Sequence, residues 1–208
     1  PAGVNLLLNA LDMDNATGWA SFRTNMSAGD VFLGTNTLYL LGTASETNVN
    51  ASGMAQHDTL TSLAAGNYTM TCVAKAGPTD PGLLQMRPTE DGDFGNRAEA
   101  WFNLETGAVG TVSTPGTNFT AATSKIVDLG GGEYRCSLTF TTDATLSLRP
   151  RYYIADTDGT LNTTIGKDLQ LCGAQFEAYH VATSLIITGA SSEARAKDEA
   201  SCVIADSI

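Results

Sequence analysis

The chain has 208 residues, and its 22 acidic against 11 basic residues give a net charge of −11. An acidic surface repels nucleic acid, so we expect no nucleic-acid partner. Only 16% of the residues are charged, and Gly, Thr, Ser and Asn separate short apolar runs, which predicts an all-β chain of strands joined by tight turns.

No stretch approaches the roughly 18 consecutive apolar residues that span a bilayer, so we expect no membrane span. The start, PAGVNLLLN, lacks the basic flank and cleavage site of a signal peptide. The four cysteines lie far apart without a CxxC pair, and three of them fall in apolar strand patterns. We expect free buried thiols, with disulfides as the alternative, at Cys72, Cys136, Cys172 and Cys202.

The first third of the chain predicts few strands. Short apolar runs at Asn5–Asn9 and Thr37–Leu41 are expected strands, whereas the polar stretch from Gly42 to Thr61 has no clear period and predicts a surface loop. The strictly alternating segment Gly66–Ala76 is the clearest strand of the chain, and Leu83–Arg87 predicts another that Pro88 ends.

Two acidic clusters are candidate calcium sites, and both are more simply read as solvated acidic turns. The first lacks the later Gly and distal Glu of an EF-hand loop, and the second lies in an expected loop at Thr89–Asn96. No other cofactor is expected. The clusters are Asp12, Asp14 and Asn15, and Glu90, Asp91 and Asp93.

The middle of the chain predicts two hairpins. Ala98–Leu104 places Trp101 and Phe102 on opposite faces of a strand, and Ala108–Val112 returns beside it. A loop follows, and then a short strand at Lys125–Leu129, a glycine turn at Gly130–Gly132, and an alternating strand at Glu133–Thr141 that points Tyr134, Cys136, Leu138 and Phe140 inward.

Ser147–Ala155 carries the best candidate binding residues. Pro150 cannot donate to a ladder and predicts an edge strand. Arg149, Arg151 and Tyr153 alternate onto one face, where a ring can stack on a sugar and guanidinium groups can reach hydroxyls or acidic groups, so these three are candidate glycan-binding residues. The alternative, which the residue types alone favour, is an ordinary solvated strand face.

The stretch Asp168–Gly189 predicts a central strand at Asp168–Glu177, then a turn and a second short strand that closes the domain, because both faces of the first strand are apolar or mixed. Glu177 and His180 are expected to flank that turn rather than to act as an acid–base pair. His57 and His180 each stand apart from any Cys or His at ligand spacing and are expected on the surface.

About ten or eleven short strands without a convincing helix predict an antiparallel two-sheet β-sandwich, most simply a jelly roll. No GxSxG, HExxH or Walker-type loop is present, and the sequence selects no pair of carboxylates for glycoside hydrolysis. We therefore expect no catalytic residues and no enzymatic activity.

Five segments in this order resemble the jelly-roll domains of tailed-bacteriophage virion surface proteins: tail fibres, tailspikes, head fibres and capsid-decorating proteins. These domains are similar to carbohydrate-binding modules. The resemblance covers roughly Asn5 to Ala190, does not extend to Met13–Ala65, and is most specific at GAQFE. The segments are NYTMTCVAKAG, AWFNLETGAVGTV, KIVDLGGGEYRCSLTFT, RYYIADTDGT and LQLCGAQFEAYHVATSLIITGA.

The resemblance implies a jelly-roll domain at residues 1–190, with residues 191–208 as a C-terminal arm or the start of a further strand or domain. It implies a non-enzymatic structural component of the virion surface that contacts other capsid or tail proteins. By analogy it also implies a homo-oligomer, such as a trimer, and host surface polysaccharide as a ligand. The alternative functions are a carbohydrate-binding module of a polysaccharide-degrading enzyme and a catalytic lyase or hydrolase.

Overall fold

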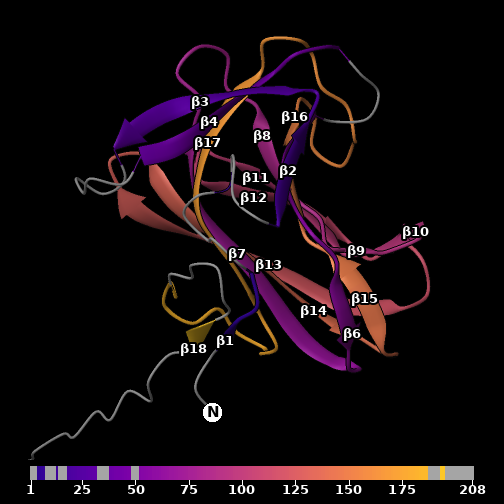
Figure 1. Cartoon of the computed structure of the whole chain (residues 1–208). Coiled ribbons are helices and arrows are strands. Elements are labelled where there is room, and N and C mark those ends of the chain that lie inside the picture. Colours follow the sequence, from indigo (N-terminus) through magenta and orange to yellow (C-terminus); the bar gives the residue numbers. More distant parts are fainter. Residues whose placement is uncertain are drawn as a thin grey trace, which may run out of the picture.

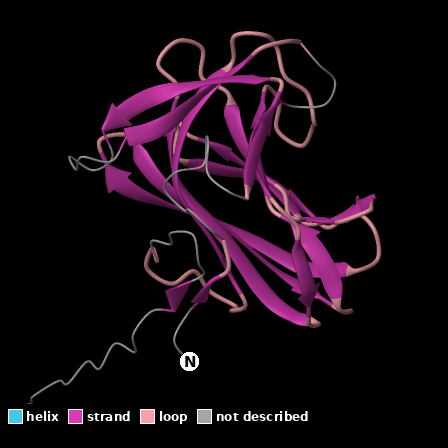
Figure 2. Cartoon of the chain, viewed as in Figure 1, coloured by secondary structure: helices cyan, strands magenta, loops and turns pink. Residues whose placement is uncertain are grey.

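The computed structural model describes residues 4–7, 13, 18–31, 38–47, 52–186 and 193–194. Within these ranges every regular element is a β-strand, so no described helix is long and apolar enough to cross a membrane (Figure 2). The all-β prediction is confirmed.

Two six-stranded antiparallel sheets form the body of the molecule (Figure 1). The first sheet contains, in spatial order, β12 (Ala108–Ser113), β11 (Glu99–Asn103), β8 (Leu83–Met86), β16 (Arg151–Ala155), β5 (Ser52–His57) and β2 (Trp19–Phe22). The second contains β13 (Phe119–Gly130), β14 (Glu133–Thr142), β7 (Gly66–Ala76), β17 (Asp168–Glu177), β4 (Leu38–Ala44) and β3 (Thr24–Val31).

Two smaller sheets complete the fold. A four-stranded sheet, here called the small sheet, lies at one end of the molecule, at the lower right of Figure 1, and a two-stranded ladder joins segments from near the two ends of the chain. The small sheet runs β10 (Asp93–Arg97), β9 (Thr89–Glu90), β15 (Leu146–Arg149) and β6 (Leu60–Leu63), and the ladder pairs β1 (Val4–Asn5) with β18 (Glu193–Ala194). The predicted two-sheet β-sandwich is confirmed, with the small sheet as an addition.

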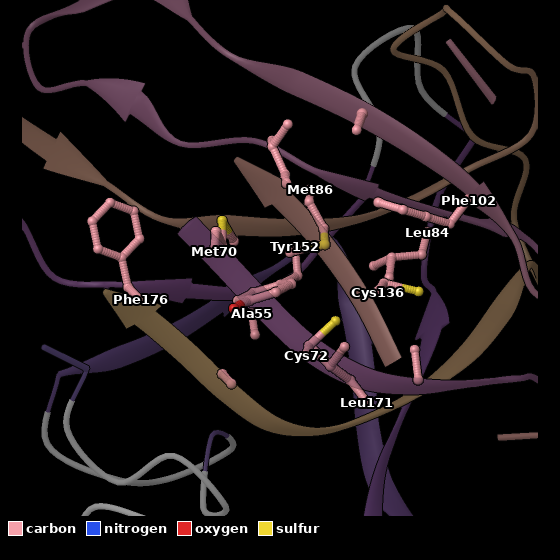
Figure 3. Packing of buried hydrophobic residues seen from close by; sticks show 14 of the residues in the cluster. Ala55, Met70, Cys72, Leu84, Met86, Phe102, Cys136, Tyr152, Leu171 and Phe176 are labelled. Atoms are coloured by element: carbon pink, nitrogen blue, oxygen red, sulfur yellow. The ribbon is translucent and has the colours of Figure 1, made fainter. Parts of the chain in front are cut away.

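The core fills the space between the two large sheets (Figure 3). Alternate residues of each strand point into it, as the period of two requires. Phe140 is fully buried there, with ring centroids 5.5 Å from Phe119 and 6.0 Å from both Tyr68 and Phe176. Phe102 joins this core, whereas Trp101 points to the other face of the first sheet, as the alternation predicts.

The expected central strand is confirmed, because β17 lies between β7 and β4 and all ten of its residues are buried. The prediction of a second short strand after β17 is wrong for residues 178–186, which contain no strand. Side chains hold this segment instead: Ile186 N donates to Gln175 Oε1 at 2.7 Å, and Asn5 Nδ2 donates to the Ile186 carbonyl at 3.0 Å. Residues 187–189 lie outside the described ranges.

Three expected loops contain strands. The stretch from Gly42 to Thr61 includes the end of β4, all of β5 and the start of β6; the expected loop at Thr89–Asn96 is the β9–β10 hairpin; and β13 begins at Phe119, before the expected strand at Lys125. These strands are short or polar and lack strict alternation, so tertiary pairing, not local pattern, decides them. In the expected strand Asn5–Asn9, only Asn5 is a strand residue among those described.

The thiols of Cys72, Cys136 and Cys172 are free and buried, which confirms the prediction for these three. Burial raises the pKa of all three thiols because a thiolate is poorly solvated in the core, and it raises that of Cys172 to about 11. Cys202 lies outside the described residues.

The surface position expected for His57 is wrong. It lies in β5 with 4% of its area exposed, its ring 4.9 Å from that of Trp19 and its Nδ1 2.9 Å from the Asp58 carbonyl oxygen. Burial lowers the pKa of His57 more than the contact with Asp58 raises it. The sequence around His57 is polar and did not predict β5, the strand in which His57 is buried.

Candidate functional site

A row of polar side chains crosses the outer face of the first sheet, away from the core. Arg151 at the start of β16 pairs in register with Gln56 of β5, and the Arg87 backbone N–H donates to the Arg151 carbonyl at 2.9 Å. Side chains in register on adjacent strands share a face. The Arg151 Nε therefore reaches Gln56 Oε1 at 2.7 Å, and Arg87 lies on its other side.

A second row, two residues further along β16, is aromatic. Tyr153 pairs with Gly53 on one side and with Gln85 on the other, and Gln85 in turn pairs with Trp101. A Cβ at Gly53 would lie 2.0 Å from the Phe22 ring, so only glycine there lets that ring lie across the strand. Phe22 consequently meets Tyr153 edge to face, with ring centroids 5.8 Å apart.

Pro150 joins two sheets. Arg149 ends β15 of the small sheet, and Arg151 begins β16, which lies between β8 and β5 of the first sheet. The edge position predicted from Pro150 is therefore wrong: the proline avoids a ladder hydrogen bond by lying between strands, not at an edge. Arg149 Nη2 donates to Thr59 Oγ1 at 2.9 Å and pairs with Asp91 at 3.0 Å.

The β9–β10 hairpin contributes an exposed aromatic ring. Phe94 is 58% exposed, and its ring centroid lies 4.6 Å from the guanidinium carbon of Arg151. Its carbonyl accepts a hydrogen bond from Arg97 Nη1 at 3.1 Å. The hairpin thus holds an aromatic ring against a guanidinium group, an arrangement that favours both partners.

These elements enclose a pocket of about 670 Å³, here called the arginine pocket. Its lining combines four guanidinium groups, three aromatic rings, an amide and an aliphatic side chain, and none of its described lining residues carries a carboxylate. They are Phe22, Arg23, Gln56, Arg87, Phe94, Arg149, Arg151, Tyr153 and Leu161.

Glu99 is shared by two arginines, one of which, Arg87, lines the arginine pocket. Its Oε2 is 2.8 Å from Arg97 Nε and 3.7 Å from Arg87 Nε, and the side chains of Glu99 and Arg87 are each only 7% exposed. Burial lowers the pKa of Arg87, and nearby Arg97 and Arg151 lower it as well, while Tyr153 and Glu99 oppose them. The pocket therefore adjoins, through Arg87, an ionic network centred on a buried carboxylate.

The structure brings all three candidate glycan-binding residues to this pocket, and all three line it. Arg151 and Tyr153 are each only 5% exposed. The Tyr153 ring is packed between Phe22 and the guanidinium group of Arg87, whose carbon lies 5.9 Å from the ring centroid. The exposed ring is that of Phe94. Sequence reasoning missed the six other lining side chains; of these only Arg87, a cation that ends an apolar run just before a proline, carried a signal.

The second acidic cluster is divided among separate partners. Asp91 pairs with Arg149, Glu90 Oε2 accepts a hydrogen bond from Asn118 at 2.8 Å, and Asp93 accepts one from the Gly95 N–H at 2.9 Å. No group of three or more His, Cys, Asp or Glu side chains suited to a metal occurs within the described ranges. Asp12, Asp14 and Asn15 lie outside them.

Glu177 and His180 are not an acid–base pair. Glu177 is fully buried, and its carboxylate accepts hydrogen bonds from the Thr183 hydroxyl at 2.6 Å and the Thr183 N–H at 3.2 Å, so it anchors the segment after β17. His180 is exposed, as predicted, with its ring centroid 4.6 Å from that of Tyr179. Glu177 thus has a structural role.

Known proteins resemble the chain in fold. No protein-family model matches its sequence, and no curated protein matches it either. Among solved structures, the CBM22-1 xylan-binding domain of Xyn10C from Paenibacillus barcinonensis superposes with a TM-score of 0.50 at 13% identity, covering 87% of this chain and 98% of that domain. A structure described as "CBM4 structure and function" gives 0.43 at 13% identity, covering 82% and 97%. The jelly-roll β-sandwich of carbohydrate-binding modules is therefore the fold of this chain.

Proposed function

We propose that the chain is a non-catalytic carbohydrate-binding protein and that the arginine pocket is its ligand site. The observation that carries this proposal is the pocket itself, in which guanidinium donors surround an exposed ring on the outer face of a sheet. Rings bind the apolar faces of sugars, and planar guanidinium groups donate to their oxygen atoms. The xylan-binding title of the neighbouring CBM22-1 structure supports the same class of ligand.

The chemistry of the arginine pocket favours binding over turnover. Glycoside hydrolysis uses two carboxyl groups about 5 to 10 Å apart, on either side of the scissile bond. None of the described lining residues carries one, and Glu99, the buried carboxylate beside Arg87, is already shared between Arg87 and Arg97. A bound sugar would meet hydrogen-bond donors and rings, but no acid or base from these residues.

Phe94→Ala should weaken glycan binding about tenfold, or ~1.4 kcal/mol, because it removes the exposed ring of the pocket. We would screen the purified chain on an array of neutral and acidic polysaccharides and measure the best ligand by isothermal titration calorimetry. Phe94 is 58% exposed, so the variant should fold normally, unlike one at the buried Tyr153.

Val181→Ala is the matched control, since Val181 is 47% exposed and lines a different hollow, beside His180. Its affinity should equal that of the wild type. If no polysaccharide on the array binds, or if Phe94→Ala binds as tightly as the control, the proposed function is wrong.

The biological setting proposed for this binding is the surface of a tailed-phage virion, as a capsid decoration, head fibre or tail fibre. Its partners there would be other virion proteins and host surface polysaccharide. The ordered resemblance of five segments, including NYTMTCVAKAG and LQLCGAQFEAYHVATSLIITGA, supports this setting. Virion surface proteins commonly form symmetric homo-oligomers.

We expect light scattering of the purified chain to give a multiple of its 21.7 kDa mass, three-fold for a trimer. A monomeric mass, together with the absence of the chain from purified particles, would contradict the virion setting. The second candidate, a module of a polysaccharide-degrading enzyme, is favoured by the Xyn10C likeness and requires a catalytic domain in the same polypeptide.

A further inference from the structure

The arginine pocket concentrates positive charge on an acidic protein. Four of the chain's 11 basic residues line it, although acidic residues outnumber basic ones two to one in the whole chain. A cluster against the overall charge of a surface creates a local field that attracts anions.

Most of these arginines have carboxylate partners, but the charges do not cancel. Arg23 pairs with Glu46 at 2.7 Å and Arg149 pairs with Asp91 at 3.0 Å. Arg87 and Arg97 share the single carboxylate Glu99. With Arg151 included, these five guanidinium groups have three carboxylate partners among the described residues, so their ion pairs leave an excess of two positive charges.

Arg151 is the guanidinium group that lacks a counterion. It is only 5% exposed, its Nε donates to Gln56 Oε1, and its guanidinium carbon lies over the Phe94 ring, yet it forms no ion pair within the described part of the chain. A buried charge without a partner is costly, and an anion at its terminal nitrogens would offset that cost. A fixed guanidinium group presents two parallel donors, which match a carboxylate, sulfate or phosphate group.

We propose that the arginine pocket recognises an acidic saccharide, and that Arg151 binds the acidic group of the sugar while Phe94 supports its ring. This inference rests on the proposed glycan-binding function and names the class of ligand. Carboxylates and sulfate or phosphate esters share the required chemistry, a compact oxyanion on a sugar, and the experiment distinguishes the carboxylate from the sulfate ester. A neutral chain such as unsubstituted xylan would leave the excess charge unpaired.

The test compares pairs of probes that share a sugar backbone and differ in charge. Oligogalacturonate and its methyl-esterified form carry the same backbone, as do dextran sulfate and dextran. We expect calorimetry to show at least tenfold tighter binding of one acidic probe than of its neutral counterpart. Raising the salt from roughly 50 to 500 mM should reduce that preference, because salt screens the ion pair.

Arg151→Gln should lower the affinity for the acidic probe to that for the neutral probe and leave the neutral affinity unchanged. Arg151→Lys keeps the charge but not the two parallel donors of the guanidinium group, so it should retain part of the preference for the acidic probe. Lys125→Gln removes one exposed positive charge from the second sheet and should change neither affinity. Thermal melts would establish that each variant is folded. The comparison of acidic and neutral probes on the wild-type chain does not depend on the variants.

The outcomes separate the two proposals. Preference for oligogalacturonate or for dextran sulfate supports the inference and identifies the acidic group. Equal affinity for charged and neutral probes, or an equal effect of Lys125→Gln and Arg151→Gln, overturns the acidic ligand while leaving carbohydrate binding intact. If neither these probes nor any polysaccharide on the array binds, the proposed function falls as well.

Discussion

Glu99→Ala should lower the free energy of unfolding by about 3–5 kcal/mol, because it leaves the buried Arg87 and the partly buried Arg97 without their shared carboxylate. Glu99 and Arg87 are each 7% exposed, and Arg97 is 22% exposed. Glu99 also accepts a hydrogen bond from the Ser113 hydroxyl at 2.9 Å. Guanidinium chloride unfolding followed by tryptophan fluorescence would measure the loss.

Glu46→Ala is the control for this prediction. Glu46 also pairs with an arginine, but its side chain is 50% exposed and that of its partner Arg23 is 39% exposed. Surface ion pairs contribute about 0–1 kcal/mol, so this variant should be nearly as stable as the wild type. Equal losses in the two variants would show that burial does not set the strength of the Glu99 network.

Phe140→Ala should also cost about 3–5 kcal/mol, the usual range for truncating a buried phenylalanine. Its ring contacts those of Tyr68, Phe119 and Phe176, so the cavity would open between four strands of the second sheet and the facing core. We expect an unchanged m-value in denaturant titrations and a lower midpoint, as for a change in stability alone.

Val127→Ala provides the comparison, because Val127 is 39% exposed on β13 and its truncation opens no cavity. Its midpoint should differ little from that of the wild type. A loss below about 1 kcal/mol at Phe140, far under the range for buried aromatic residues, would mean that the core collapses around the missing ring.

Long, strictly patterned strands were predictable from sequence. Gly66–Ala76 and Asp168–Glu177 form β7 and β17 with the expected bounds, because both are interior strands of the second sheet whose residues are buried over most (β7) or all (β17) of their length. The strands β5, β9 and β10 could not be found this way. They are short, contain Gly or acidic residues, and are stabilised by neighbours distant in sequence.

The residues of the arginine pocket were likewise predictable from sequence only in part. Alternation within β16 places Arg151 and Tyr153 on one face, because the period of two holds within a strand, whereas Arg149 reaches the pocket from β15 of the small sheet. The remaining residues come from β2, β5 and β10 and from connections between strands, such as Arg87 just after β8. Their adjacency depends on strand order, which no local pattern reports. The Phe94 ring in particular required knowledge that the β9–β10 hairpin folds beside Arg151.

The three buried thiols can report how often the second sheet opens to solvent. Cys72, Cys136 and Cys172 come from three adjacent strands, β7, β14 and β17, and each is shielded from solvent with a raised pKa. A thiol reagent can modify them only when the second sheet separates, since reaction needs an accessible thiolate. In a Cys202→Ser variant, the rate of thiol modification therefore measures the rate at which the core is exposed, without the introduction of a new reactive residue.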